Sequence, residues 1–222
     1  MERHIEGHVY ERDTRRSLID AAERLFARGG VASPSLREVA RLAGARNVAA
    51  VQYHFGDRDG LVNAILDKHL ATVDAERHRL LDDYEAGRTS GLHALAAALV
   101  RPYARKLDDA DGGPEFLQVY ADLLNRAQPL IEPGALDDPD KSLYRWRRLV
   151  DPLIDDDAIV LHRRFTATAV TITELARRAR AGRTDHRLFV STLVDTARAI
   201  IAAPTSAETR ELLADRVADE SM

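Results

Sequence analysis

Residues 36–55 have the sequence LREVARLAGARNVAAVQYHF, in which two short helical patterns flank a turn. The first pattern repeats apolar residues with helical spacing and ends at Gly44, and a serine just before it can cap its start. The second is expected to run from Val48 to Phe55, with Asn47 as its cap. Two short helices joined by a turn that contains glycine predict a helix-turn-helix.

The second of these helices has an unusual outward face. It has no charged residue between Arg46 and Asp57, although a surface helix made only for solubility would carry Lys and Glu there. On a helical wheel, its apolar face lies on one side, and Ala49, Ala50 and Tyr53 point to the opposite, outward side. Gln52 and His54 lie at the flanks. In a DNA major groove, Gln can bond adenine edges and Ala can contact a thymine methyl group. The alternative is a plain helical hairpin that keeps its aromatic rings in the core.

The rest of the chain has helical periodicity as well, and no segment alternates like a strand. The first helix is expected to end at RGG, residues 28–30, and a fourth to start near Asp57 or Asp59 and continue for about 28 residues. Later helices are expected at about 90–107, 114–128, 140–151, 156–181, 185–203 and 206–219. We therefore expect an all-α fold with a three-helix DNA-binding domain at residues 1–60 and a larger helical domain at residues 61–222.

The composition bounds the class of protein. A chain of 222 residues with 45% hydrophobic and 31% charged residues is ordinary for a soluble protein. It has no cysteine, which excludes disulfides and thiolate chemistry. No stretch approaches the roughly 20 apolar residues of a membrane span, and the charged start lacks a signal segment. We expect a cytoplasmic protein that does not contact a membrane.

The net charge of −4 does not favour nucleic-acid binding by itself. Residues 1–60 hold ten Arg against nine Asp and Glu, which gives +1 and leaves −5 for the remainder. Binding to DNA must therefore depend on where individual cations lie.

The segment from Thr14 to Leu66 resembles the DNA-binding domain of the TetR family of bacterial transcriptional regulators. The matching stretches are AAERLFARGG (21–30), SLREVARLAG (35–44) and VQYHFGDRDGLVNAIL (51–66). The turn GARN is one residue longer than the family's commonest spacing. The resemblance implies that DNA is contacted by Arg37, Arg46, Asn47, Ala49, Gln52, Tyr53, His54 and Arg58. Of these, Tyr53 and His54 are similar to phosphate-contacting positions, which orient a protein on DNA more than they specify sequence.

Two late helices carry more apolar surface than a monomer needs. The expected dimer interface consists of Phe165, Ile172, Leu175, Phe189, Leu193 and Ile200. A pair of ordinary core helices is the alternative, and the resemblance favours a four-helix bundle across a two-fold axis. Such symmetry would place two recognition helices about 34 Å apart, which suits a palindromic site.

The resemblance also implies an effector pocket among the helices between about residues 60 and 184. The candidate ligand-binding residues are Tyr103, Phe116, Tyr120, Trp146 and His162, for each of which ordinary core packing is the alternative. We expect a small, largely apolar effector and no cofactor. By moving the long fourth helix, this effector would release the protein from its operator.

The expected function is that of a ligand-responsive transcriptional regulator and, as is commoner in the family, a repressor. One alternative is a non-catalytic helical adaptor. Another is an all-α enzyme that uses His162 with the acidic residues 155–157. No metal site is expected, because His4 and His8 have no matching ligands and DDADGG (108–113) lacks the later carboxylates of a calcium loop.

Overall fold

The computed structural model describes residues 2–45, 47–126 and 137–220, and every regular element in these ranges is a helix. The expected all-α fold is therefore confirmed. In chain order the helices are α1 (Glu2–Gly29), α2 (Leu36–Leu42), α3 (Ala49–Phe55), α4 (Arg58–Glu85), α5 (Gly91–Ala104), the 3₁₀ helix η1 (Arg105–Leu107), α6 (Gly113–Leu124), α7 (Ser142–Val150), the 3₁₀ helix η3 (Asp151–Leu153), α8 (Asp156–Val160), α9 (Arg163–Arg180), α10 (Arg187–Ala202) and α11 (Ala207–Glu220).

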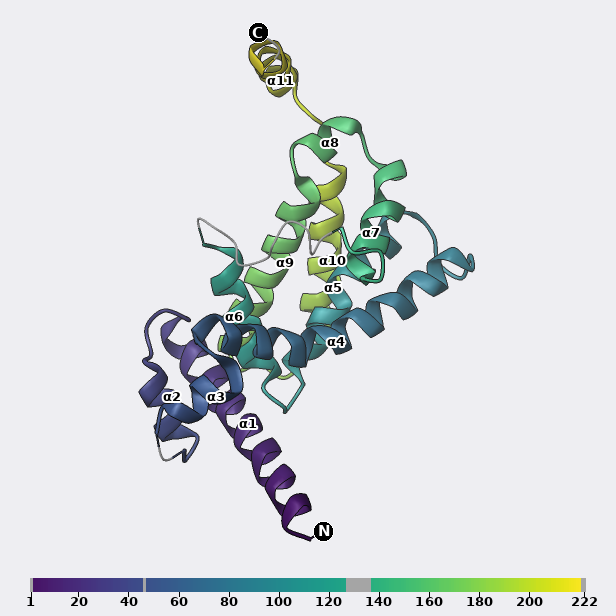
Figure 1. Cartoon of the computed structure of the whole chain (residues 1–222). Helices are drawn as coiled ribbons and strands as arrows, with labels where there is room; N and C mark the ends of the chain where they lie inside the picture. Colours follow the sequence, from purple (N-terminus) through teal and green to yellow (C-terminus); the bar gives the residue numbers. More distant parts are fainter. Residues whose placement is uncertain (1, 46, 127–136, 221–222) are drawn as a thin grey trace.

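The first three helices form a unit at one end of the molecule, and α4 leads from this unit into a larger group of helices (Figure 1). The small unit is closed by fully buried side chains, with Leu18 and Ala22 from α1, Val39 from α2 and Val51 from α3. These are the positions that the helical periodicity places inside. The fold class predicted from the sequence, with an N-terminal three-helix unit, is thus confirmed, and the division into residues 1–60 and 61–222 stays a prediction.

Local capping fixes where α2 and α3 begin. Ser35 Oγ accepts a hydrogen bond from the Glu38 N–H at 3.2 Å, and the Ser35 N–H donates to Glu38 Oε2 at 2.7 Å, which completes a capping box. The bonds from Ser35 lower the pKa of Glu38. Helix α3 begins one residue later than expected, with Val48 as its N-cap, but Asn47 Oδ1 does accept from the Ala49 N–H at 3.0 Å.

The turn between α3 and α4 depends on two glycines. Gly56 ends α3 at a φ of 77°, in the left-handed region that favours glycine. A Cβ atom on Gly60 would lie 1.9 Å from the Phe55 carbonyl oxygen, so no larger residue fits there. Asp57 caps α4 by accepting from the Gly60 N–H at 2.9 Å. As expected, α4 then spans 28 residues, and the domain boundary predicted at residue 60 falls in its first turn.

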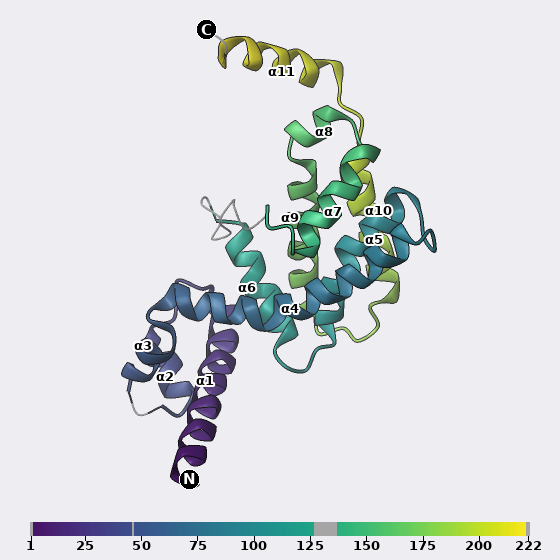
Figure 2. The ribbon, with the colours of Figure 1, turned by 45° about the vertical axis from the view of Figure 1, so that its right-hand side comes forward.

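The helices from α5 to α10 surround the second core, with α9 and α10 running alongside each other (Figures 1 and 2). The prediction of one helix at 156–181 is wrong, because the chain breaks after α8. His162 adopts a left-handed conformation (φ 53°) and α9 starts after it in a new direction. Residues 127–136, which include most of the expected loop at 128–140 and the end of the helix expected at 114–128, lie outside the described residues.

The last helix, α11, lies away from the other helices in both views (Figures 1 and 2). Within the described ranges, no single helix has the length and apolar character needed to cross a bilayer. One bent pair, residues 187–202 with 207–216 at an angle of 55°, meets that criterion by length and composition only.

Candidate nucleic-acid interface

Helix α3 is fixed to its domain along one face. Val51 is fully buried, and Phe55 is half-buried against the same core, as their spacing predicts. Ala50 is also half-buried and packed on the core, so the expectation that it points outward is wrong. The reason is that α3 packs against both α2 and α4, so residues on either side of Val51 also contact the core.

The opposite face of α3 is open to solvent. Ala49 and Gln52 are exposed, and Tyr53 keeps 74% of its surface accessible. The His54 ring meets the Tyr53 ring edge-on at 5.0 Å between centroids and is half-buried. This face therefore combines small side chains with polar tips, which is the character that a helix needs to approach base-pair edges.

The remaining predicted contacts have different surroundings. Arg37 on α2 and Asn47 before α3 are exposed, whereas Arg46 lies outside the described residues. The guanidinium of Arg58 is occupied within the domain: it donates to the Val31 carbonyl and lies over the Phe26 ring, 5.9 Å from its centroid. Arg58 thus joins α4 to the turn after α1, in addition to any contact it makes with DNA.

Arg15 on α1 is a cation that the sequence prediction did not include. Its guanidinium lies over the Phe55 ring at 5.3 Å from the centroid, which places it beside the end of α3. The signal in the sequence is its spacing of three, seven and eleven residues from Leu18, Ala22 and Phe26, because Arg15 extends the stripe of these buried residues toward the exposed start of α1.

Comparison with known proteins agrees with this geometry. Residues 18–65 match the model of the bacterial regulatory proteins of the tetR family. The chain carries the helix-turn-helix domain of the TetR family. The TetR domain includes all four residues that close the N-terminal core, together with α2, α3 and the start of α4.

Two curated proteins and a solved structure are similar to this chain. The HTH-type transcriptional regulator TtgR and the probable HTH-type transcriptional regulator ArpR, both from Pseudomonas putida, are each 42% identical over 62 residues. This match covers 28% of the chain and only 29% of the length of each relative. A solved TetR-family regulator from Streptomyces coelicolor A3 is 19% identical with a TM-score of 0.44, over 85% of this chain and 94% of that one.

The TetR domain is attached to the second core by a group of charged side chains. Lys68 Nζ on α4 lies 3.0 Å from Glu23 and 3.2 Å from Asp20 on α1, and 3.4 Å from Asp111 in the loop before α6. Burial opposes the charge on Lys68, but Glu23 and Asp20 outweigh the effect of burial and raise the pKa of Lys68. Asp122 on α6 also accepts from the Val31 N–H at 3.1 Å. Helices α1, α4 and α6 therefore meet at one junction.

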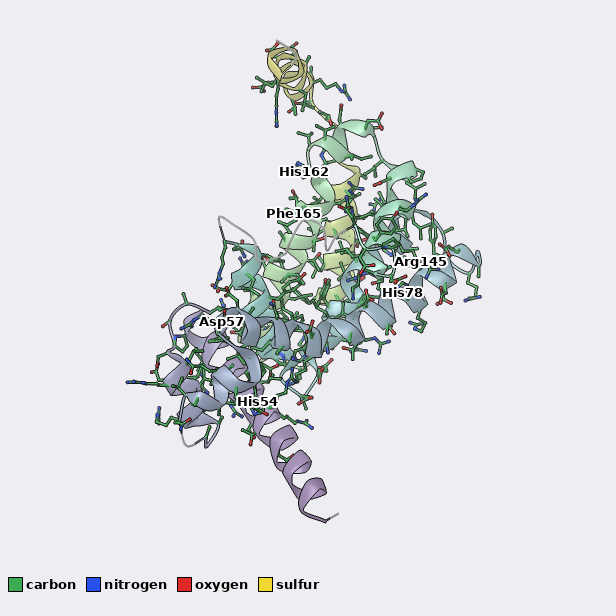
Figure 3. All side chains as sticks on the ribbon, viewed as in Figure 1. His54, Asp57, His78, Arg145, His162 and Phe165 are labelled. Carbon is green, nitrogen blue, oxygen red and sulfur yellow. The ribbon has the colours of Figure 1, made fainter. Side chains whose placement is uncertain are left out.

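Three of the five predicted ligand-binding residues lie together. The Tyr120 ring lies 5.5 Å from Phe116 and 5.9 Å from Tyr103, and all three side chains are buried. Burial, together with the neighbouring Tyr103 phenol, raises the pKa of Tyr120. Trp146 is buried elsewhere and donates its indole N–H to the Leu95 carbonyl at 2.7 Å. His162 is exposed just before α9 and does not join the ring cluster (Figure 3).

Arg77 is a residue of this second core that the prediction missed. It is 2% exposed, its guanidinium lies 5.1 Å from the Tyr103 ring centroid, and it donates to the Ala98 carbonyl and to Ser142 Oγ. The sequence does mark Arg77, because this arginine lies on the same face of α4 as buried Val73 and Leu81, which are four residues before and after it.

The structure also has a surface groove of about 740 Å³ between α4, α5 and the start of α10. Arg79, Arg101, Arg105 and Arg187 are among its lining residues, and none of the five predicted ligand-binding residues is. Within the described ranges, no group of three or more His, Asp or Glu side chains is arranged to hold a metal ion.

The predicted dimer residues divide into two groups. Three of them are 0–4% exposed within the single chain and belong to its own core: Ile172, Leu175 and Leu193. The prediction that these three lie in a dimer interface is therefore wrong. Phe189 and Ile200 are half-buried against that core. Phe165 keeps 44% of its surface exposed on α9 (Figure 3).

Proposed function

We propose that the protein is a sequence-specific DNA-binding transcriptional regulator that works as a homodimer in the cytoplasm. The observation that carries this proposal is the outward face of α3, where Gln52 and Tyr53 are exposed although the helix itself is held by buried Val51. The match of residues 18–65 to the tetR family supports it. Gln52 would contact a base edge, and Tyr53, His54 and Arg37 would bind phosphates.

The exposed faces of α9 and α10 are the proposed dimer interface. On α9 the face consists of exposed Phe165 with half-buried Ala169 and Thr173, four and eight residues further on. On α10, Leu188 is 81% exposed, and Thr192 and Thr196 follow at the same spacing with their hydroxyls bonded to their own helix. Small side chains whose polar groups are already bonded allow close packing against a partner helix. A second copy of the chain would pack against this surface.

The proposed effector site is the cluster of Tyr103, Phe116 and Tyr120 between α5 and α6. The effector would be a small, largely apolar molecule, and Arg77 beside Tyr103 would supply a polar contact. The His69 ring on α4 stacks on Phe116 with 4.6 Å between ring centroids, and its Nε2 is hydrogen-bonded to Glu23 on α1 at 2.9 Å. A displacement of Phe116 would therefore move His69 and, through Glu23, the TetR domain. A ligand that binds the displaced arrangement better would release DNA, as a repressor requires.

The test is a selection of bound duplexes from fragments of the genome that encodes the protein, followed by gel shifts at low and high salt. We expect a palindromic site bound by two chains, with affinity that falls steeply as salt rises. A screen for small molecules that release this site then addresses the effector. A purified protein that retains no duplex at low ionic strength would contradict the proposal, and binding of a protein partner through α3 would favour an adaptor instead.

A further inference from the structure

We propose that Arg15 makes a third helix, α1, part of the DNA-binding surface by contacting a backbone phosphate beside the recognition helix α3. This inference rests on the proposed function and adds a residue to it. A chain of negative net charge needs each cation on its DNA-facing side, and Arg15 is an arginine that a direct contact places against the end of α3.

The position of Arg15 is fixed by stacking. Its guanidinium lies 5.3 Å from the Phe55 ring centroid, and the Phe55, His54 and Tyr53 rings follow one another at 6.0 and 5.0 Å. A row of rings therefore leads from exposed Tyr53 to Arg15. An arginine that stacks on a ring keeps its N–H groups free at the edge of the plane, in the geometry that binds a phosphate.

The charge of Arg15 is available. The side chain is exposed, and among the described residues it has no carboxylate within ion-pair distance. Its neighbour Arg16 differs, because it is paired with Asp111 at 3.2 Å, and Arg58 is occupied by the Val31 carbonyl. A fixed cation that pairs with no carboxylate among the described side chains is suited to an anionic partner.

The direction of α1 supports the same placement. Its N-terminal half extends past α2 and α3 on the side away from the larger group of helices (Figures 1 and 2). A duplex bound to α3 would lie on this side, because the other side of the TetR domain is covered by α4 and α6 at the charged junction. Arg15 would then face the phosphates that flank the groove occupied by α3.

The experiment compares Arg15→Ala with Arg24→Ala. Arg24 is also exposed on α1, has no ion pair with a described residue, and lies about 180° around the helix from Arg15. Both variants lose one charge per chain. The probe is a labelled duplex of about 30 base pairs that the wild-type protein selects from a random-sequence library, and its Kd is measured between about 50 and 200 mM salt.

The slope of the logarithm of the DNA-binding constant against the logarithm of the salt concentration is negative. For Arg15→Ala we expect this slope to become shallower by about 1.8 per dimer, because one phosphate contact per chain is lost. The ratio of the binding constant of the wild type to that of Arg15→Ala therefore decreases about tenfold as the salt rises from about 50 to 200 mM. Arg24→Ala should keep the wild-type slope, and Arg15→Lys, which retains the charge, should recover most of it. A purely structural role of Arg15 would not produce this pattern.

Equal slopes for the wild type and both alanine variants, with folding verified by thermal unfolding, would overturn the role of Arg15 and leave the proposed function standing. A wild-type protein that selects no duplex would overturn both. The two failures are therefore distinguishable.

Discussion

Arg37 and Arg58 belong to the same helix-turn-helix, but their surroundings give them different tasks. Arg37 is exposed on α2, whereas Arg58 bonds the Val31 carbonyl and covers the Phe26 ring. The sequence pattern could not separate them, because both are arginines near the recognition helix. Only the tertiary fold, which brings Val31 to within reach of position 58 across 27 residues, reveals the difference.

We predict that Arg58→Ala lowers the free energy of unfolding by about 1–3 kcal/mol, since it leaves a partly buried carbonyl without its donor. Arg37→Ala should change stability by less than about 0.5 kcal/mol and weaken DNA binding instead. Urea unfolding of the two variants checks this. Equal stabilities for both would show that the Arg58 contacts contribute nothing.

At the scale of elements, local signals predicted the helix-turn-helix well. Ser35, Gly44, Gly56 and Asp57 mark the ends of α2, α3 and α4 through caps and left-handed glycines that act within a few residues. The break at His162 had no such signal, because a left-handed histidine has no distinctive neighbours in sequence. The faces of α9 and α10 were also ambiguous, since apolar stripes look alike whether they fill the chain's own core or a dimer interface.

The junction of α1, α4 and α6 contains a testable electrostatic contribution from Asp109. The hydrogen bond that Asp109 Oδ2 accepts from Lys106 Nζ, at 2.8 Å, lowers the pKa of this carboxyl in the folded state. A lowered folded-state pKa stabilises the protein above the unfolded pKa, and this stabilisation is lost as the pH falls through the folded value. The stabilisation should therefore decline below about pH 5.

We predict that Asp109→Asn costs about 0.5–1 kcal/mol at pH 7 and makes unfolding less sensitive to pH between about 5 and 3. The control is Asp67→Asn, an exposed carboxylate on α4 without a partner among the described residues. Urea unfolding across this pH range measures both. If the free energy of unfolding of Asp109→Asn depends on pH as that of the wild type does, then Asp109 does not contribute to the pH dependence.

At the scale of the whole molecule, a single TetR domain offers few cations, so the proposed dimer would supply tight binding by linking two copies. We predict that Phe165→Glu produces monomers, because it places a charge in the proposed interface without disturbing the chain's own core. Light scattering should then give about the 24.7 kDa of one chain in place of twice that mass. DNA affinity should fall more than about tenfold.

The matched control for Phe165→Glu is Leu153→Glu in η3, because Leu153 is 45% exposed, as Phe165 is, but lies outside the α9 face. This variant should stay dimeric. If Phe165→Glu also remains a dimer, then the exposed face of α9 is not where the copies meet.

The central claim is that α3 contacts base edges through Gln52, and a parallel selection of duplexes by the wild type and by Gln52→Ala tests it most directly. Because Gln52 is exposed and supports no packing, the variant should fold normally and bind DNA non-specifically as before. We predict that discrimination at one base pair in each half-site falls by about 1–3 kcal/mol. Identical base preferences at every position for the two proteins would contradict the account.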